Sequence, residues 1–316
     1  MTGTNPPETT ILPFGDAAIA AAAAIIGTGG CVAVPTETVY GLAADATDGA
    51  AVAGIYAAKG RPSFNPLIVH VADVAMAERL GVFDAVAAQL AEAFWPGPLT
   101  IVVPRSDHCP VASIATAGLD TIALRCPAHP AMQALIAASG KPLAAPSANA
   151  SGGVSPTTAA HVLATLDGRV PLIVDAGPCV AGLESTIVKV VGDRLVVLRP
   201  GPVTAEMLAE ATGLLVVSDT SGEISAPGQL ASHYAPGKPV LLGCDVPPED
   251  AFMIGFGAGD CDYQLSASSD LAEAAARLFD ALHAGAASER LRIAVVPIPL
   301  DGLGAAINDR LMRAAA

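Results

Sequence analysis

Aromatic and basic residues are both scarce in this chain. Aromatics make up 4% of the 316 residues, and 16 Lys and Arg stand against 30 Asp and Glu, which gives a formal net charge of −14. A protein that binds nucleic acid tightly on its own needs a basic surface. The acidic balance therefore argues against autonomous nucleic-acid binding, although it leaves room for a local basic patch. Because 52% of the residues are hydrophobic and few are aromatic, the core must consist chiefly of Ala, Val, Leu and Ile.

Long apolar runs and paired cysteines are also missing. No stretch of about 18 residues is free of polar interruption, so we expect no transmembrane span and no membrane partner. The apolar stretch 17–26 is short and no Lys or Arg precedes it, unlike a signal peptide. We expect a buried helix there, with Asp16 as its N-cap.

The six cysteines form no C-x-x-C pair. We expect them to be reduced and mostly buried, as in a cytoplasmic protein.

The hydrophobic pattern predicts helices that alternate with short strands. Helices are expected at residues 19–26, 50–58, 82–94 and 130–139, and strands at residues 31–34, 67–71, 99–103, 121–125, 143–145 and 172–174. Two further strands, 186–191 and 194–198, flank Gly192-Asp193, which predicts a hairpin with a type II′ turn. Since strands both alternate with helices and pair directly, we expect an α/β fold with a mixed sheet. Residues 1–13 are expected to be loose.

The chain changes character after this first domain, which we place at residues 11–203. Residues 219–238 are rich in Ser, Gly and Pro, and we interpret 204–238 as an ordered linker. Strands expected at 239–243, 253–257 and 291–296, with helices around 271–282 and at 304–312, predict a small Rossmann-like α/β domain at residues 239–316. Gly255-Phe256-Gly257-Ala258-Gly259 lacks the final spacing of a dinucleotide motif, so it is a poor indication of such a site.

Polar residues gather just past the first predicted strand of the large domain. The stretch Pro35-Thr36-Glu37-Thr38-Val39-Tyr40 lies where open α/β sheets bind their ligands. Lys59 and Arg61 follow, and a lysine point charge beside an arginine fork suits phosphate oxygens. A solvated helix end explains these two cations equally well. The residues alone therefore favour an anion or nucleotide site with a small polar co-substrate.

Eight ordered motifs resemble those of one known family. PTETVYGL, KGRP, NPLIVH, WPGPLT, AGLDTIALR, APSAN, ESTI and LRPG occur in this order between residues 11 and 201, with a further motif at residues 232–236. Together they resemble the YrdC-like family, which contains the L-threonylcarbamoyladenylate synthases. The resemblance implies a twisted, mixed α/β sheet domain, followed by a linker and the smaller C-terminal domain.

The resemblance also implies an activity. It predicts a nucleotidyltransferase that forms threonylcarbamoyl-AMP and pyrophosphate from L-threonine, bicarbonate and ATP with Mg²⁺, for N6-threonylcarbamoyladenosine modification of tRNA. The implied partner is a downstream threonylcarbamoyl transferase complex, with at most weak binding to tRNA. One alternative is a non-catalytic tRNA- or RNA-binding module, which the acidic balance disfavours. A carbamoyl transferase related to hydrogenase maturation is a second, but nothing here resembles its zinc-finger and acylphosphatase regions. A paralogue that takes another amino acid is a third.

Matching motifs assign individual residues to two sites. Lys59 and Arg61 are the implied catalytic cations. The implied ATP contacts are Lys59, Asn65, Thr116, Ser147, Asn149, Ser155, Arg199 and Tyr234. The implied L-threonine contacts are Thr36, His70, Arg125, Ala145 and Ser185. Ordinary structural roles compete with several of these: Thr36 as a turn hydroxyl, His70 as a core histidine, and Arg125 in a surface salt bridge.

The linker motif departs from the family pattern. The usual block begins S-P-G-M-K, whereas this chain has Ala226-Pro227-Gly228-Gln229-Leu230, so a basic residue is missing. The resemblance implies that the linker 204–238 acts as a lid over the active site, with Tyr234 reaching back over the nucleotide. Without the basic residue, we expect no contact from its position to phosphate. Glu37 and Glu184 carry oxygen ligands of the kind Mg²⁺ prefers, but we favour hydrogen bonds within the loops for both. We expect no metal site built by the protein itself.

Overall fold

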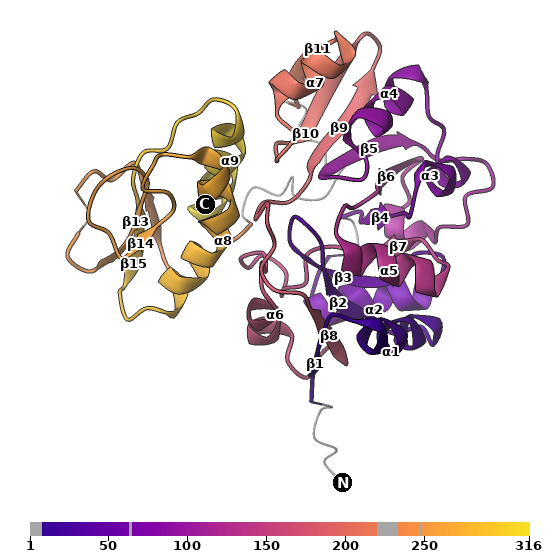
Figure 1. Ribbon diagram of the computed structural model, residues 1–316, viewed down its shortest axis with the longest axis horizontal. Helices are drawn as coiled ribbons and strands as arrows, with labels where there is room; N and C mark the ends of the chain where they lie inside the picture. The colour runs from indigo at the N-terminus through magenta and orange to yellow at the C-terminus, as the bar shows by residue number, and fades with distance from the viewer. Residues whose placement is uncertain (1–7, 63–64, 220–232, 247) are drawn as a thin grey trace.

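The computed structural model describes residues 8–62, 65–219, 233–246 and 248–316. They form two α/β units, the larger from the N-terminal part of the chain and the smaller, in orange and yellow, from the C-terminal part (Figure 1). The larger contains an 11-stranded mixed sheet and the smaller a 4-stranded sheet. The predicted fold class is therefore confirmed. No helix in these four ranges has both the length and the apolar character needed to cross a membrane.

The large sheet has the order β1-β8-β2-β3-β7-β4-β6-β5-β9-β10-β11. Its strands are β1 (Thr10–Pro13), β2 (Val32–Pro35), β3 (Tyr40–Asp45), β4 (Ile68–His70), β5 (Leu99–Pro104), β6 (Thr121–Arg125), β7 (Leu143–Ala144), β8 (Leu172–Asp175), β9 (Thr186–Val191), β10 (Arg194–Arg199) and β11 (Leu215–Ser218). The helices are α1 (Asp16–Gly27), α2 (Gly49–Lys59), α3 (Val74–Leu80), α4 (Ala85–Phe94), the 3₁₀ helix η1 (Ser113–Thr116), α5 (Pro130–Ser139), α6 (Ala159–Leu166) and α7 (Ala205–Thr212). Parallel and antiparallel pairs alternate near the centre, as in β4–β6 and β5–β6.

Helix α2 shows how the local sequence directs a charged side chain towards the interior. The Asp48 side chain accepts hydrogen bonds from the backbone N–H groups of Ala50 and Ala51, which caps the first turn. Gly60 ends the helix with a φ of 61°, a left-handed conformation that glycine adopts readily. Lys59 is the last helical residue and is only 3% exposed. The helix end therefore carries a buried ammonium group.

The predicted hairpin is present. β9 and β10 pair antiparallel across Gly192-Asp193. Gly192 has a φ of 61°, the positive value that the first central position of a type II′ turn requires.

Several sequence predictions about the large domain were wrong. Asp16 is the first residue of α1 rather than its cap, because Gly15 holds the cap position; its carboxylate still stands at the positive end of the helix. Residues 10–13, expected to be loose, form β1 and pair with β8. Of the six free cysteines only Cys126 and Cys179 are buried, since the others lie nearer the surface.

The start of the predicted linker belongs to the large sheet. Residues 205–218 form α7 and β11, and β11 pairs in parallel with β10. The Thr204 hydroxyl accepts from the Met207 N–H and Gly213 follows the helix with a φ of 70°, two boundary signals that the composition of the segment obscured. The segment 204–238 is therefore not linker throughout. We propose to assign residues 205–218 to the first domain.

The small unit has four parallel strands in the order β12-β15-β13-β14. They are β12 (Val240–Leu242), β13 (Ala251–Gly255), β14 (Tyr263–Gln264) and β15 (Arg292–Val295), with helices α8 (Leu271–Ala287) and α9 (Leu303–Ala314). α8 links β14 to β15, as in the predicted Rossmann-like arrangement.

Helices α8 and α9 face the large unit (Figure 1). One buried apolar cluster joins Val39, Leu183 and Tyr234 to Leu278 and Phe279 of α8. The backbones also approach closely, since a Cβ on Gly182 would lie 2.4 Å from the Ala276 Cα. The small unit is therefore packed directly against the motifs that the sequence analysis singled out.

Candidate active site

A cavity with about 550 Å³ of empty volume lies among the loops at the centre of the large sheet. Its wall comes from both ends of the chain. The lining residues are Thr36, Thr38, Val39, Gly41, Arg61, Ile68, His70, Arg125, Ala145, Pro146, Ser147, Glu184, Ser185, Arg199, His233 and Tyr234.

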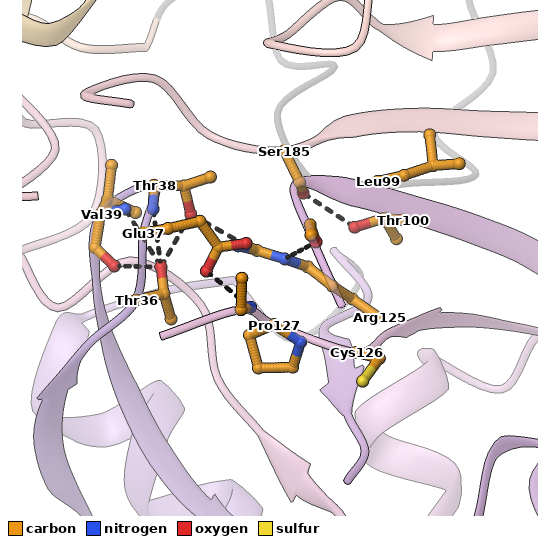
Figure 2. A network of polar contacts seen from close by, with 12 residues as sticks. Thr36, Glu37, Thr38, Val39, Leu99, Thr100, Arg125, Cys126, Pro127 and Ser185 are labelled. Atoms are coloured by element: carbon orange, nitrogen blue, oxygen red, sulfur yellow. Dashed lines mark hydrogen bonds and ion pairs between the residues drawn. The ribbon is translucent and has the colours of Figure 1, made fainter. Parts of the chain in front are cut away.

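Arg125 is held by three partners at the end of β6 (Figure 2). Its Nη2 lies 2.7 Å from Glu37 Oε1, its Nη1 donates to Thr38 Oγ1 at 3.0 Å, and its Nε donates to the Gly97 carbonyl at 3.2 Å. Burial alone would raise the pKa of Glu37, but the Arg125 charge and hydrogen bonds outweigh it and lower that pKa. The hydrogen bonds use two of the five guanidinium N–H groups, because Nη2, although paired with the Glu37 charge, has no hydrogen-bond partner among the described residues. The Arg125 pair is thus buried, not the surface salt bridge considered above.

The Thr36 hydroxyl closes a tight turn. It accepts from the backbone N–H groups of Thr38 and Val39 and donates to the Val39 carbonyl at 2.7 Å. Thr36 therefore has the turn role that competed with its predicted substrate role, while it also borders the cavity. Sequence reasoning missed Thr38, although it lies in the same PTET motif.

Ser185 connects two strands and an arginine. Its hydroxyl lies 2.8 Å from the Thr100 hydroxyl, a contact drawn in Figure 2, and accepts from Arg199 Nη2 at 3.1 Å. The Ser185 carbonyl accepts from Nε and Nη2 of Arg199. This clamp fixes the guanidinium beside the cavity.

His70 ends β4 with an unpaired nitrogen. The ring is 2% exposed, and Nδ1 has no hydrogen-bond partner among the residues that the structure describes. Burial, and then the positive charge of Arg125, lower the pKa of His70 to about 3. A neutral imidazole with a free nitrogen therefore faces the cavity, beside the apolar wall of Ile68 and Ala145.

Lys59 does not border the cavity. Its Nζ donates to the carbonyls of Ser147 and Asn149, both at 2.5 Å, and lies 3.3 Å from Asn149 Oδ1. An ammonium group has three donors, so these contacts account for all of them. Burial, and then the Arg61 charge, hold the pKa of Lys59 well below its usual value. In this structure Lys59 fixes the Ser147–Asn149 loop.

Arg61 does face the cavity, together with Ser147 and Arg199. Arg61 Nη2 donates to the Pro66 carbonyl at 3.2 Å, whereas its buried Nε has no partner in the described part of the chain. Burial lowers the pKa of Arg61 to about 10, so it stays charged at neutral pH. The Ser147 hydroxyl donates to Asn149 Oδ1 at 2.6 Å.

Four other predicted ATP contacts lie behind the wall. The Thr116 hydroxyl donates to the Ser113 carbonyl, the Asn149 amide to the Gly153 carbonyl, and the Ser155 hydroxyl to Glu184 Oε1 at 2.5 Å. Asn65 is 1% exposed, and its Oδ1 has no partner among the described residues. None of these four side chains is among the residues that border the cavity.

Tyr234 closes the cavity from the second half of the chain. It has a φ of 65° and is 1% exposed. Its ring stacks on Phe279 at 5.4 Å and meets the His233 ring edge-on at 4.1 Å. His233 also borders the cavity, and burial lowers its pKa to about 4. The motif at 232–236 pointed to this histidine, but the sequence analysis did not select it. Gln229, where the family has a basic residue, lies outside the described residues.

Both carboxylates considered for Mg²⁺ have protein partners. Glu37 pairs with Arg125, and Glu184 Oε2 lies 2.8 Å from Arg310 Nε. These ion pairs with arginines of β6 and α9 differ from the hydrogen bonds within the loops that the sequence analysis favoured.

An α/β protein that encloses arginines, hydroxyls and a neutral imidazole in one cavity is of the class that binds a small anionic ligand. Comparison with known proteins gives the family. Residues 24–201 match the Sua5, YciO and YrdC family model, described as "Telomere recombination", and residues 203–316 match "Threonylcarbamoyl-AMP synthase, C-terminal domain". The chain therefore belongs to the Sua5/YciO/YrdC family and carries the C-terminal domain of its two-domain members.

Similar proteins extend over almost the whole chain. The threonylcarbamoyl-AMP synthase of Bacillus subtilis is 42% identical over 96% of this chain and 94% of its own length. That of Pyrococcus abyssi is 38% identical, over 93% and 92%. The crystal structure of P. abyssi Sua5 complexed with L-threonine has a TM-score of 0.88 and 36% identity, and covers 97% of this chain and 98% of that one. The YrdC-like resemblance is thus confirmed.

Proposed function

We propose that this chain is an L-threonylcarbamoyladenylate synthase, a nucleotidyltransferase that uses L-threonine, bicarbonate and ATP. One observation carries the proposal: Arg125 borders the same cavity as Arg61 and Arg199. A carboxylate and a triphosphate can then be held next to one another. Full-length similarity to threonylcarbamoyl-AMP synthases supports it.

The reaction places a demand on the cavity. The threonine amine and bicarbonate give a carbamate and water. A carbamate oxygen then attacks the α-phosphorus of ATP, a new P–O bond forms, and the bond to the β-phosphate oxygen breaks as pyrophosphate leaves with the electron pair. The carbamate is labile in water, so a closed cavity that holds it in line with the phosphate favours transfer.

Arg125 and His70 form the amino-acid end in this proposal. Nη1 of Arg125 has an N–H beyond the one bound to Thr38, and Nη2, which pairs with the Glu37 charge, has no hydrogen-bond partner among the described residues. Both nitrogens suit a substrate carboxylate. The free nitrogen of His70 and the hydroxyl of Ser185 would contact the polar groups of the amino acid, and Ala145, which also borders the cavity, would pack against its methyl group.

Arg61 and Arg199 form the nucleotide end. Both would stabilise the charge that develops on the transferring phosphate, and Tyr234 would cover the nucleotide. Lys59, predicted from the sequence as a catalytic cation, acts here through the Ser147–Asn149 loop. Mg²⁺ carried by ATP would neutralise charge on the leaving pyrophosphate. Since Glu37 and Glu184 are engaged with arginines, we propose that phosphate and water oxygens hold this ion.

The product would serve N6-threonylcarbamoyladenosine modification of tRNA in the cytoplasm. Because threonylcarbamoyl-AMP is a reactive mixed anhydride, a transferase complex must consume it promptly. The chain itself needs at most weak contact with tRNA, in keeping with its charge of −14.

Pyrophosphate release tests the proposal. The purified protein is given ATP and Mg²⁺, with or without bicarbonate, and with L-threonine, L-serine or no amino acid. Release that requires both bicarbonate and L-threonine is expected. Release with L-serine but not with L-threonine would mean that L-serine is the substrate. No release and no binding of ATP or L-threonine, together with a salt-dependent shift of tRNA in a gel, would favour the RNA-binding module instead.

A further inference from the structure

Arg310 of α9 reaches from the small unit to the wall of the cavity. Its side chain is 0% exposed. Nε lies 2.8 Å from Glu184 Oε2, Nη2 donates to the Pro200 carbonyl at 2.9 Å, and Nη1 lies 2.6 Å from Asp309 Oδ2. Arginine is rarely fully buried, and this one has partners on both units. It calls for a role at the cavity.

Glu184 receives Arg310 on one side and borders the cavity on the other. Burial by itself would raise its pKa, but the charges of Arg310 and then Arg199, with the Ser155 hydrogen bond, lower the pKa to about 2. Glu184 is therefore an anion stabilised by the charges of two buried arginines. It pairs directly with Arg310, while the Arg199 guanidinium is clamped to Ser185.

Arg310 also contacts the residue that covers the cavity. Its guanidinium carbon lies 5.3 Å from the centroid of the Tyr234 ring, within the distance of a cation–π interaction. Phe279 of α8 stacks on the same ring at 5.4 Å. Through Arg310, the small unit thus both contacts the Tyr234 ring and neutralises the Glu184 carboxylate.

We propose that Arg310 is a positioning residue for the nucleotide end of the cavity. By binding Glu184 it leaves Arg199, which pairs with no carboxylate in the described part of the chain, available to a phosphate. The inference rests on the proposed function, since it takes ATP as the ligand. Without Arg310, the buried Glu184 carboxylate would need another cation. Arg199 is the next cation whose charge acts on Glu184. If Arg199 paired with Glu184, its charge would no longer be available to the phosphate.

The charged and titratable groups around Glu184 come from every element packed against it. They are Arg310 and Asp309 of α9, Arg199 of β10, Lys59 of α2, and His233 and Tyr234 of the covering segment. Removal of the nearest cation would raise the pKa of Glu184. The competition for Arg199 would then depend on pH, which a purely structural support would not produce.

The test measures ATP affinity by calorimetry in the full-length protein, from mildly acidic to mildly alkaline pH. Arg310→Met is expected to weaken ATP binding about tenfold to hundredfold. The loss should be largest at alkaline pH and shrink as the pH falls, because a protonated Glu184 releases Arg199. The double variant Arg310→Met/Glu184→Gln is expected to bind within about threefold of wild type with no added pH dependence, since no carboxylate competes. Arg277→Met, on the exposed face of α8, is the control.

The outcomes separate the two proposals. A wild-type protein that binds no ATP would refute the proposed function itself. If wild type binds ATP but Arg310→Met loses affinity equally at every pH, and the double variant is no better, Arg310 is only a structural support and the inference fails. Thermal unfolding is recorded for each protein. Should the single variant not fold, the double variant decides, because a folded double variant with a tenfold or greater loss overturns the inference.

Discussion

Glu37 and Arg125 form an ion pair of 2.7 Å at the amino-acid end of the cavity, with side chains only 11% and 4% exposed. An arginine charge cannot be removed by deprotonation at ordinary pH, so burial requires a counter-charge. Glu37 supplies it inside the protein. Any substrate carboxylate that binds Arg125 must therefore share it with Glu37.

Glu37→Gln should destabilise the protein and increase its response to L-threonine. Loss of one partner of a buried ion pair costs about 3–5 kcal/mol. The substrate carboxylate would then meet an uncompensated guanidinium. We expect a lower melting temperature and a larger thermal shift on addition of L-threonine than in wild type. Glu273→Gln, in an exposed pair on α8, is the control. An equal shift in variant and wild type would contradict a shared Arg125.

Arg125→Lys should affect the amino acid more than the nucleotide. Lysine keeps the charge but cannot offer the planar fork that binds a carboxylate through two hydrogen bonds. We expect the KM for L-threonine to rise about tenfold to hundredfold and the KM for ATP to change much less. Steady-state pyrophosphate release with each substrate varied in turn measures both. If the KM for ATP rose more than the KM for L-threonine, Arg125 would belong to the nucleotide end of the cavity instead.

Lys59→Met should lose both stability and ATP affinity, whereas Arg61→Gln should lose chiefly ATP affinity. Lys59→Met leaves the carbonyls of Ser147 and Asn149 without their donor, at about 1–3 kcal/mol for each unsatisfied buried group. It should lower the melting temperature as well as ATP affinity. Arg61→Gln should weaken ATP binding about tenfold with a small change in melting temperature. Melting without ligand and calorimetric titration with ATP separate the two. Equal stability in both variants would mean that Lys59 does not support the loop.

Buried histidines should make stability fall on the acid side of neutrality. Burial lowers the pKa of His70 to about 3 and the pKa values of His233 and His283 to about 4. An unfolded histidine takes up its proton near pH 6.5, so between about pH 6.5 and about pH 4 the unfolded state binds more protons and stability decreases as pH falls. Each histidine contributes a slope of up to about 1.4 kcal/mol per pH unit.

Denaturant unfolding across this pH range checks the slope. His283→Gln keeps a donor for the Ser155 carbonyl and should reduce the slope by one histidine's share. His108→Gln, at an exposed position, is the control. A slope that does not change in His283→Gln would exclude this histidine as a source.

Much of the fold could be predicted because some segments carry their own boundaries. β6 and α5 occur at the predicted residues 121–125 and 130–139, one an apolar run that ends in Arg125 and the other a helix with Pro130 in its first turn. β3 was missed because its residues, YGLAAD, have low strand propensity and are buried on both faces. Their strand conformation depends on pairing with β2 and β7.

The site was only partly predictable for a related reason. The motifs identified Arg61, His70, Arg125 and Arg199, which all border one cavity. A motif does not show where a long side chain points, and the Lys59 side chain points away from the cavity to the Asn149 carbonyl. No motif near α9 connects Arg310 with the cavity either. That contact arises from the packing of two units, which no local pattern encodes.

Thr100 and Ser185 hydrogen-bond to each other although 85 positions separate them, and Glu184 and Arg310 pair across 126. Contacts so distant along the chain form slowly, since the loop between them must close first. The ligand cavity should therefore be among the last parts of the protein to form. Ligands that bind only the finished cavity would slow unfolding without speeding folding.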